Sequence, residues 1–275
     1  MPVRRFRPLW ALVPALAALA PAAALGAGAA PTPPPTPIRL APTVRGVPIT
    51  GKVVALTFDD GPSPRYTPQI LDVLKREKAH ATFFLIGQEA VRFPSLVQAE
   101  AKAGMEVANH GMHHLLLRGR SEDEVTSEAS EAADVIRSLA GRAPVLYRLP
   151  QGVGDTTARA ALGRMGYVIV NWSVDTRDYL RQTPEQLVAR AMRQMAPGRI
   201  IIFHDGGGNR QASVDAVRML LPQLKAQGYT VTTVSDLLRR AGYRAPAASA
   251  GAPGTPAEEQ RRAYDRVERE LRRSI

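Results

Sequence analysis

Short apolar runs alternate with amphipathic segments through the middle of the chain, from about residue 49 to residue 243. Seven of the runs are four to six residues long and almost wholly apolar, which is typical of strands buried on both faces of a sheet. The predicted strands span residues 53–58, 81–86, 105–109, 145–148, 167–170, 200–203 and 230–234.

Between these runs, apolar residues recur every three or four positions, which predicts helices with one buried face. Ser121 and Glu124 form a capping box that begins one helix, and Gly141 follows its end. Strands that alternate with helices favour parallel pairing, either in an open sheet or in a barrel, and periodicity does not choose between them. The predicted helices span residues 67–77, 95–103, 122–139, 156–163, 185–195 and 212–227.

The two ends of the chain differ from this pattern. Residues 1–30 contain three arginines, an apolar stretch and then small residues, which predicts a signal peptide cleaved near residues 26–30, with retention as an anchor as the alternative. We therefore expect a secreted or cell-envelope protein. The remaining predicted segments are a proline-rich linker at 31–48, a single domain at 49–243, an Ala/Pro/Gly linker at 244–256 and a charged helical tail at 257–275.

Composition limits the chemistry that the chain can perform. It contains no cysteine, which excludes disulfides and thiolate ligands, so any metal ion must be bound by nitrogen and oxygen atoms. The formal net charge of +11 favours electrostatic contact with anionic envelope polymers or lipid head groups. Aromatic residues make up only 5% of the chain, so we expect no nucleic-acid partner. Separately, we expect a monomer.

Two adjacent carboxylates, Asp59 and Asp60, follow the first predicted strand. In parallel α/β folds, ligands bind at this carboxyl edge of the sheet. Asp-Gly-Pro is also common in turns, so the pair alone does not establish a site. Two acids at one strand end can nevertheless divide the work, one as a metal ligand and the other as a base.

Three histidines follow the third predicted strand, at positions 110, 113 and 114. Imidazoles four residues apart can bind one ion if the intervening turn is helix-like, and His113 is an alternative ligand to His114. Three further polar clusters also follow predicted strands: Arg148 to Gly152, Asn171 to Tyr179, and His204 with Asp205.

These motifs, in this order, resemble the polysaccharide deacetylases of carbohydrate esterase family 4, which contain a NodB homology domain. The resemblance covers about residues 50–240 and begins with Thr57-Phe-Asp-Asp-Gly-Pro62. It implies a distorted, incomplete (β/α) barrel of about seven parallel strands. It also implies one bound divalent ion, with Zn²⁺ expected first and Co²⁺, Mn²⁺ or Ni²⁺ as alternatives.

The resemblance also assigns roles to individual residues. Asp60, His110 and His114 would bind the metal ion, Asp59 would be the catalytic base and His204 the catalytic acid. Arg148 would orient Asp59, and Asp175 would act on His204. The residues implied near the substrate or its oxyanion are Pro150, Gln151, Trp172, Tyr179 and Ile202.

Four positions depart from the family's usual residues. Gly111 stands where Ser or Thr is usual, which removes a hydroxyl group that would brace the histidine loop. Gln151 replaces a common Tyr, Tyr179 a Trp and Ile202 a Leu. No proposed ligand, base or acid is affected.

The expected function is removal of N-acetyl groups from an N-acetylhexosamine polymer, with peptidoglycan or a chitin-like glycan as the substrate. The alternatives are an esterase for O-acetylated xylan and a non-catalytic protein that binds envelope glycans.

Overall fold

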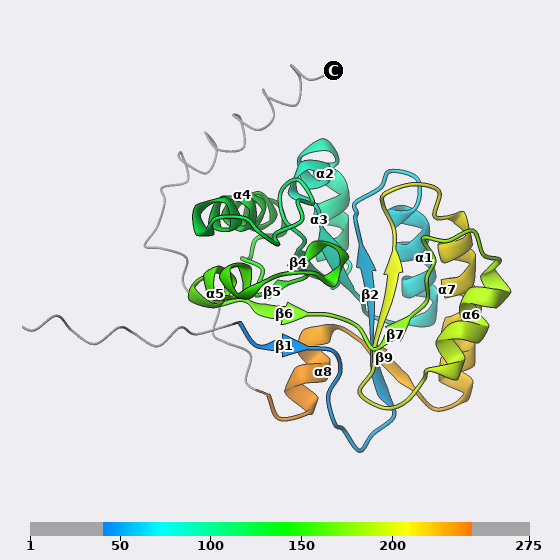
Figure 1. The fold of residues 1–275 in the computed structure, drawn as a ribbon. Coiled ribbons are helices and arrows are strands. Elements are labelled where there is room, and N and C mark those ends of the chain that lie inside the picture. The colour runs from blue at the N-terminus through cyan, green and yellow to red at the C-terminus, as the bar shows by residue number, and fades with distance from the viewer. Residues whose placement is uncertain (1–40, 244–275) are drawn as a thin grey trace, which may run out of the picture. The chain divides into compact units, whose positions relative to one another are not determined.

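Nine strands form one sheet in the computed structural model, which describes residues 41–243, and every pairing between these strands is parallel (Figure 1). Eight strands follow one another in the order β1-β6-β5-β4-β3-β2-β8-β7, while β9 pairs with β2. The sheet curls as an incomplete barrel, as predicted. The strands are β1 (Thr43–Val44), β2 (Val53–Asp59), β3 (Thr82–Leu85), β4 (Glu106–Asn109), β5 (Leu146–Tyr147), β6 (Val168–Val170), β7 (Val174–Asp175), β8 (Ile200–His204) and β9 (Thr230–Thr232).

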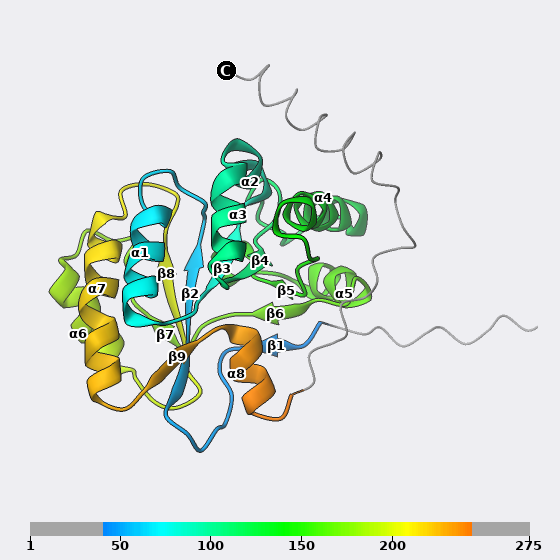
Figure 2. The same cartoon turned by 180° about the vertical axis from the view of Figure 1, so that it is seen from behind.

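Helices pack outside the strands in two groups, which Figure 2 shows on either side of β2: α1, α6 and α7 on one side, and α2 to α5 on the other. The helices are α1 (Thr67–Glu77), α2 (Gly87–Arg92), α3 (Pro94–Lys102), α4 (Glu122–Ala140), α5 (Thr156–Arg164), α6 (Pro184–Arg193), α7 (Gln211–Ala226) and α8 (Val234–Arg240), with a short 3₁₀ turn η1 (Pro150–Gly152). None of the described helices has both the length and the apolar character to cross a membrane.

Strand β2 shows how the sheet positions its polar end. Its seven residues are all buried, and they alternate between two cores. Leu56 and Phe58 join the core beneath the outer helices, whereas Val53 and Ala55 join the core that contains Leu237 of α8. Because side chains alternate along a strand, Asp59 lies on the same face as Val53 and Ala55, which is the face away from the outer helices.

The predicted helix boundaries agree closely with the structure where the sequence carries capping signals. Ser121 and Glu124 form the expected capping box of α4, and Gly141 ends that helix with a left-handed φ of 75°. Thr183 caps α6, with Pro184 as its first residue. In both helices the side-chain oxygen accepts a hydrogen bond from a backbone N–H that has no partner within the helix.

The domain begins earlier than the predicted boundary at residue 49. Part of the predicted linker belongs to the sheet, because Thr43 and Val44 form β1 beside β6 and both Ala41 and Val47 are buried. A two-residue strand has no periodicity to detect. The predicted last strand also proved too long: Val234 begins α8, whose N-terminus is capped by the Thr233 hydroxyl.

The predicted signal peptide at 1–30, the first part of the linker at 31–40, and the predicted segments at 244–256 and 257–275 lie outside the described residues.

Candidate active site

The polar clusters meet at the carboxyl edge of the sheet, as expected for parallel strands. Asp59 ends β2 and His204 ends β8, and these two residues are direct partners in the register of the two strands. His110 follows β4, Arg148 follows β5 and Trp172 follows β6. Residues far apart in the sequence therefore surround one point.

Asp60, His110 and His114 form a group that can hold a metal ion, since one potential ligand atom from each lies within 4.8 Å of the others. Oδ1 of Asp60 lies 3.4 Å from Nε2 of both histidines. This oxygen is buried and has no hydrogen-bond partner among the described residues, which is costly unless a cation compensates its charge. Two imidazoles and one carboxylate are a common set of ligands for a catalytic zinc ion. The residues present therefore fit a divalent ion.

The ionisation of these groups also suits metal binding. Burial alone would raise the pKa of Asp60, but its interaction with His110 and the charges of His204 and His114 hold that pKa below the ordinary value. Burial, together with the neighbouring His110, lowers the pKa of His114. An ionised carboxylate and a neutral imidazole are the forms that bind metals.

His113 is not part of this group. Its Nδ1 lies 3.0 Å from Oε2 of Glu128 on α4. The sequence left His113 open as an alternative ligand, and the structure favours His114.

Asp59 is held by a fully buried arginine. Nη1 of Arg148 donates to Oδ1 of Asp59 at 2.5 Å and to the Thr57 hydroxyl at 2.8 Å. The guanidinium also donates to the carbonyl oxygens of Val170 and Asn171 and lies over the Phe84 ring. This agrees with the predicted contact between Arg148 and Asp59, and it leaves Oδ2 of Asp59 facing Nε2 of His110 at 3.8 Å.

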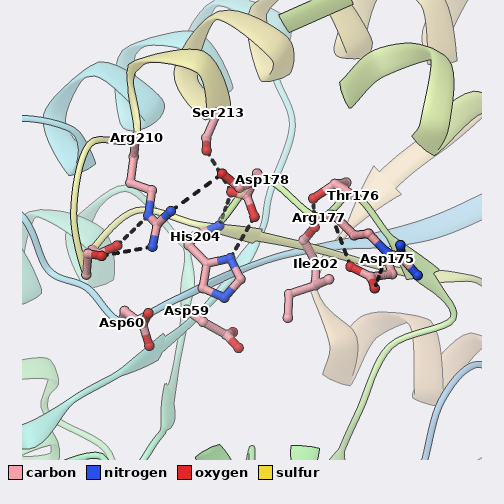
Figure 3. A network of polar contacts seen from close by, with 12 residues as sticks. Asp59, Asp60, Asp175, Thr176, Arg177, Asp178, Ile202, His204, Arg210 and Ser213 are labelled. Carbon is pink, nitrogen blue, oxygen red and sulfur yellow. Dashed lines mark hydrogen bonds and ion pairs between the residues drawn. The ribbon is translucent and has the colours of Figure 1, made fainter. Parts of the chain in front are cut away.

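His204 pairs with Asp178, and the predicted pairing with Asp175 is wrong. Nδ1 of His204 lies 2.7 Å from Oδ1 of Asp178, while Oδ2 of Asp178 accepts from the His204 backbone N–H and from the Ser213 hydroxyl. Figure 3 shows the other ring nitrogen of His204 turned toward the side where Asp59 and Asp60 lie. Burial alone would lower the pKa of His204, but Asp178, with weaker contributions from Asp59 and Asp60, raises it to about 9.

The strand register explains why Asp178, and not Asp175, contacts His204. Asp175 is the last residue of β7 and stands opposite Ile202, two residues before His204. Its carboxylate accepts from the backbone N–H of Arg177 and lies near that residue's side chain (Figure 3). The chain must turn through three more residues before a carboxylate, that of Asp178, reaches the histidine.

The three possible metal ligands, Asp59 and His204 all line one pocket of about 400 Å³. Of the residues predicted to touch substrate, only Pro150 is not part of its lining. It is buried in the short turn η1, whose next residue, Gln151, has a left-handed φ of 57°. Tyr179 is 55% exposed, and its ring lies edge-on to His204. Sequence reasoning missed one lining residue, Arg210. The lining residues are Asp59, Asp60, His110, His114, Gln151, Trp172, Asp175, Tyr179, Ile202, His204 and Arg210.

Arg210 links the loop that follows β8 with the loop that carries Asp178. Its guanidinium donates to the carbonyl oxygens of Gly206 and Gly207, and more weakly to that of Asp178. No carboxylate of the described residues lies within ion-pair distance of it. The nearby Gly206-Gly207-Gly208-Asn209 sequence is a signal for a loop, but nothing in it indicates these contacts.

Comparison with known proteins agrees with this geometry. A family model described as polysaccharide deacetylase matches residues 46–170. A peptidoglycan-N-acetylglucosamine deacetylase of Bacillus cereus is 38% identical over 195 residues, which cover 70% of this chain and 91% of that protein. A chitooligosaccharide deacetylase of Bradyrhizobium is 35% identical over 196 residues, covering 67% of this chain and 90% of that protein.

Among solved structures, that of the Bc1960 peptidoglycan N-acetylglucosamine deacetylase superposes with a TM-score of 0.68 at 35% sequence identity. The match covers 71% of this chain and 92% of that one. The chain belongs to the polysaccharide deacetylase family, carbohydrate esterase family 4, which is a family of hydrolases.

Proposed function

We propose that this protein is an exported, metal-dependent N-deacetylase of an N-acetylhexosamine polymer, with peptidoglycan as its substrate. The observation that carries the proposal is the convergence of a possible metal site, a buried carboxylate and a histidine of raised pKa on one open pocket. Amide hydrolysis requires all three: a polarised carbonyl, a base for the attacking water and an acid for the leaving nitrogen.

Asp60, His110 and His114 would hold the ion, and Zn²⁺ is our first choice because the donor set contains two nitrogens and one oxygen. A bound divalent ion would supply Lewis acidity, polarising the acetyl carbonyl and lowering the pKa of water. All other steps belong to residues of the chain.

Asp59 is the proposed base. Its Oδ1 accepts a hydrogen bond from Arg148, whereas its Oδ2 faces His110, so one oxygen is positioned by the protein and the other is available for a proton. Arg148 compensates the charge that Asp59 must carry inside the protein. Asp59 would accept a proton from water as that water attacks the acetyl carbon.

His204 is the proposed acid. With a pKa of about 9, its ring is protonated at neutral pH, and its Nδ1 is bound to Asp178. The proton on Nε2 is therefore the one available for the leaving amine. An amine leaves poorly as an anion, so this proton transfer completes the cleavage of the C–N bond.

The remaining walls of the pocket suit a sugar. The Tyr179 ring lies beside the proposed acid His204, and Trp172 lines the same pocket; we propose that these aromatic rings pack against the sugar. Ile202 is almost fully buried and adds an apolar side chain to the pocket lining, where we propose that the acetyl methyl group packs. Gln151 has a left-handed φ and lines the pocket, and we propose that its backbone N–H stabilises the oxyanion.

The choice of peptidoglycan rests on sequence features and on the relatives. Relatives are named for peptidoglycan and for chitooligosaccharide, both of which are polymers of N-acetylhexosamines. The predicted signal peptide would deliver the protein to the envelope. Its removal would take away three of the arginines and leave a net charge of +8, which would attract the protein to anionic wall polymers.

The test uses the chain without residues 1–30, freed of metal and then loaded with Zn²⁺. Acetate release is measured from peptidoglycan, from chitooligosaccharides and from acetylated xylan. We expect acetate and new free amines from peptidoglycan, and neither product after chelation. Release from xylan alone would replace the proposal with an O-acetyl esterase, and binding to glycans without any release would indicate a non-catalytic protein.

A further inference from the structure

The two proposed histidine ligands are held in different ways. His110 is 2% exposed, and its Nδ1 is tied to the Arg148 carbonyl oxygen at 2.7 Å. The side chain of His114 is 33% exposed, and no hydrogen bond from the described residues holds its Nδ1. His114 also has a left-handed φ of 58°, a conformation that costs energy for a residue with a side chain. The position of its ring therefore depends on the backbone around it.

Glu128 holds that backbone on both sides of His114. This buried residue of α4 accepts hydrogen bonds at Oε1 from the N–H of His113 at 2.7 Å and from the N–H of Leu115 at 3.3 Å. Its Oε2 contacts Nδ1 of His113 at 3.0 Å. A carboxylate that accepts several N–H groups in a buried place makes strong, charge-assisted hydrogen bonds.

Gly111 leaves the space that this arrangement needs. A Cβ atom at position 111 would lie 2.8 Å from Oε1 of Glu128 and 3.1 Å from the Tyr147 hydroxyl. The φ of Gly111 is 85°, so any side chain there would also strain the backbone. The hydroxyl that is usual at this position in the family does not fit here, and the Glu128 carboxylate lies against that space.

We propose that Glu128 is the positioning residue of the metal site: its carboxylate fixes the 113–115 backbone so that His114 points at the ion. This inference rests on the proposed function for the existence of the ion. Residues that orient metal ligands from outside the site affect metal affinity about 10–100-fold when they are replaced.

The test is the affinity of the metal-free protein for Zn²⁺, measured by competition with a chromogenic chelator, together with the absorption spectrum of the Co²⁺ form. We expect Glu128→Ala to weaken Zn²⁺ binding about 10–100-fold and to change the Co²⁺ spectrum. Glu128→Gln keeps a carbonyl oxygen for the two N–H groups, so it should retain most of the affinity. A purely structural role for the charge would not give this rescue.

Two controls separate the contributions. Glu131→Ala removes an exposed carboxylate from the same helix and should leave the Zn²⁺ affinity unchanged. His113→Ala removes the side-chain contact but keeps both backbone N–H groups, so it should weaken binding less than Glu128→Ala does.

The outcomes distinguish this inference from the proposed function. If the unaltered protein binds no divalent ion, the proposed function fails. If it binds Zn²⁺ and a folded Glu128→Ala protein binds it equally well, the positioning role is overturned. Should Glu128→Ala not fold, Glu128→Asp decides, because its shorter side chain cannot reach both N–H groups: a weaker affinity supports the role, and an unchanged affinity overturns it.

Discussion

The base side and the acid side of the pocket are built as opposite charge pairs. On one side, the buried cation Arg148 holds the carboxylate of Asp59. On the other, the buried carboxylate of Asp178 holds the imidazole of His204. In each pair the more deeply buried partner, Arg148 or Asp178, is the helper residue. The residue that would meet the substrate lies nearer the pocket.

The two helpers are anchored differently. Arg148 lies in the interior of the sheet and binds oxygens from β2, from β6 and from the loop that follows β6. Asp178 lies in a loop, and its supports are Ser213 of α7 and the His204 backbone. The proposed reaction needs an ionised base and a protonated acid at the same pH. One pocket provides both because a buried partner of opposite charge stabilises each required form.

The largest expected effect follows from removing the base. Asp59→Asn should lower kcat for deacetylation about 10²–10⁴-fold, the usual range for loss of a general base. Zn²⁺ affinity should stay near normal, because the three proposed ligands remain. Acetate release and metal content measure the two quantities, and a variant that kept a tenth of the activity would exclude Asp59 as the base.

Removing the helper on the base side should lower stability as well as activity. Arg148→Met leaves a buried carboxylate without its cation, a change that costs about 3–5 kcal/mol of unfolding free energy in comparable pairs. Urea unfolding measures it. The double variant Arg148→Met with Asp59→Asn should recover part of that loss, and simple additivity of the two changes would show that the pair is not coupled.

Removing the helper on the acid side should act through pH. In the metal-free protein, the pKa of His204 should fall from about 9 toward its ordinary value of 6.5 in Asp178→Asn. NMR titration of the ring measures this. At pH 8 the variant ring would be about 3% protonated, so activity should fall roughly 30-fold there and less at lower pH. An unchanged pH profile would contradict the assignment.

The pair of His204 and Asp178 should also stabilise the fold more at low pH than at high pH. Because the folded-state pKa of His204 is raised, its pairing with Asp178 stabilises the fold fully below about pH 6.5. That contribution should decline as the pH rises and be lost above about pH 9. Thermal melts of Asp178→Asn should therefore differ most from those of the unaltered protein on the acid side of this range.

The smallest effect is expected at Asp175, the residue that the family resemblance implied as the partner of His204. Asp175→Asn should change kcat less than about threefold and leave the alkaline limb of the pH profile in place, because its carboxylate binds Arg177 and not His204. A shift of that limb as large as in Asp178→Asn would restore Asp175 to the role.

Much of this architecture is predictable from the sequence. Runs such as Val53–Phe58 identify buried parallel strands, and the capping box at Ser121 fixes where α4 begins. The convergence of Asp60, His110 and His114 follows from their shared position after strands, since all parallel strands end at one edge.

The remaining features depend on three-dimensional detail that periodicity does not carry. Asp175 ends β7 and Asp178 lies in the loop that follows, and only the register of β7 against β8 decides which of the two acids reaches His204. The roles of Ser213, Arg210 and Glu128 come from helices and loops packed behind the site, where single polar residues give no pattern. Of the three two-residue strands, β5 lies within the predicted apolar run at 145–148, whereas β1 and β7 are too short for any alternation and have no such run around them.

Arg148 serves the site twice, through different parts of the same residue. Its guanidinium donates a hydrogen bond to Asp59, while its backbone carbonyl oxygen accepts one from Nδ1 of His110. Every amino acid placed at position 148 would still present that oxygen. A substitution at position 148 can therefore remove the contact with the proposed base and keep the hydrogen bond that orients His110. Natural variants that lose hydrolysis through such a substitution would be expected to still bind the metal ion.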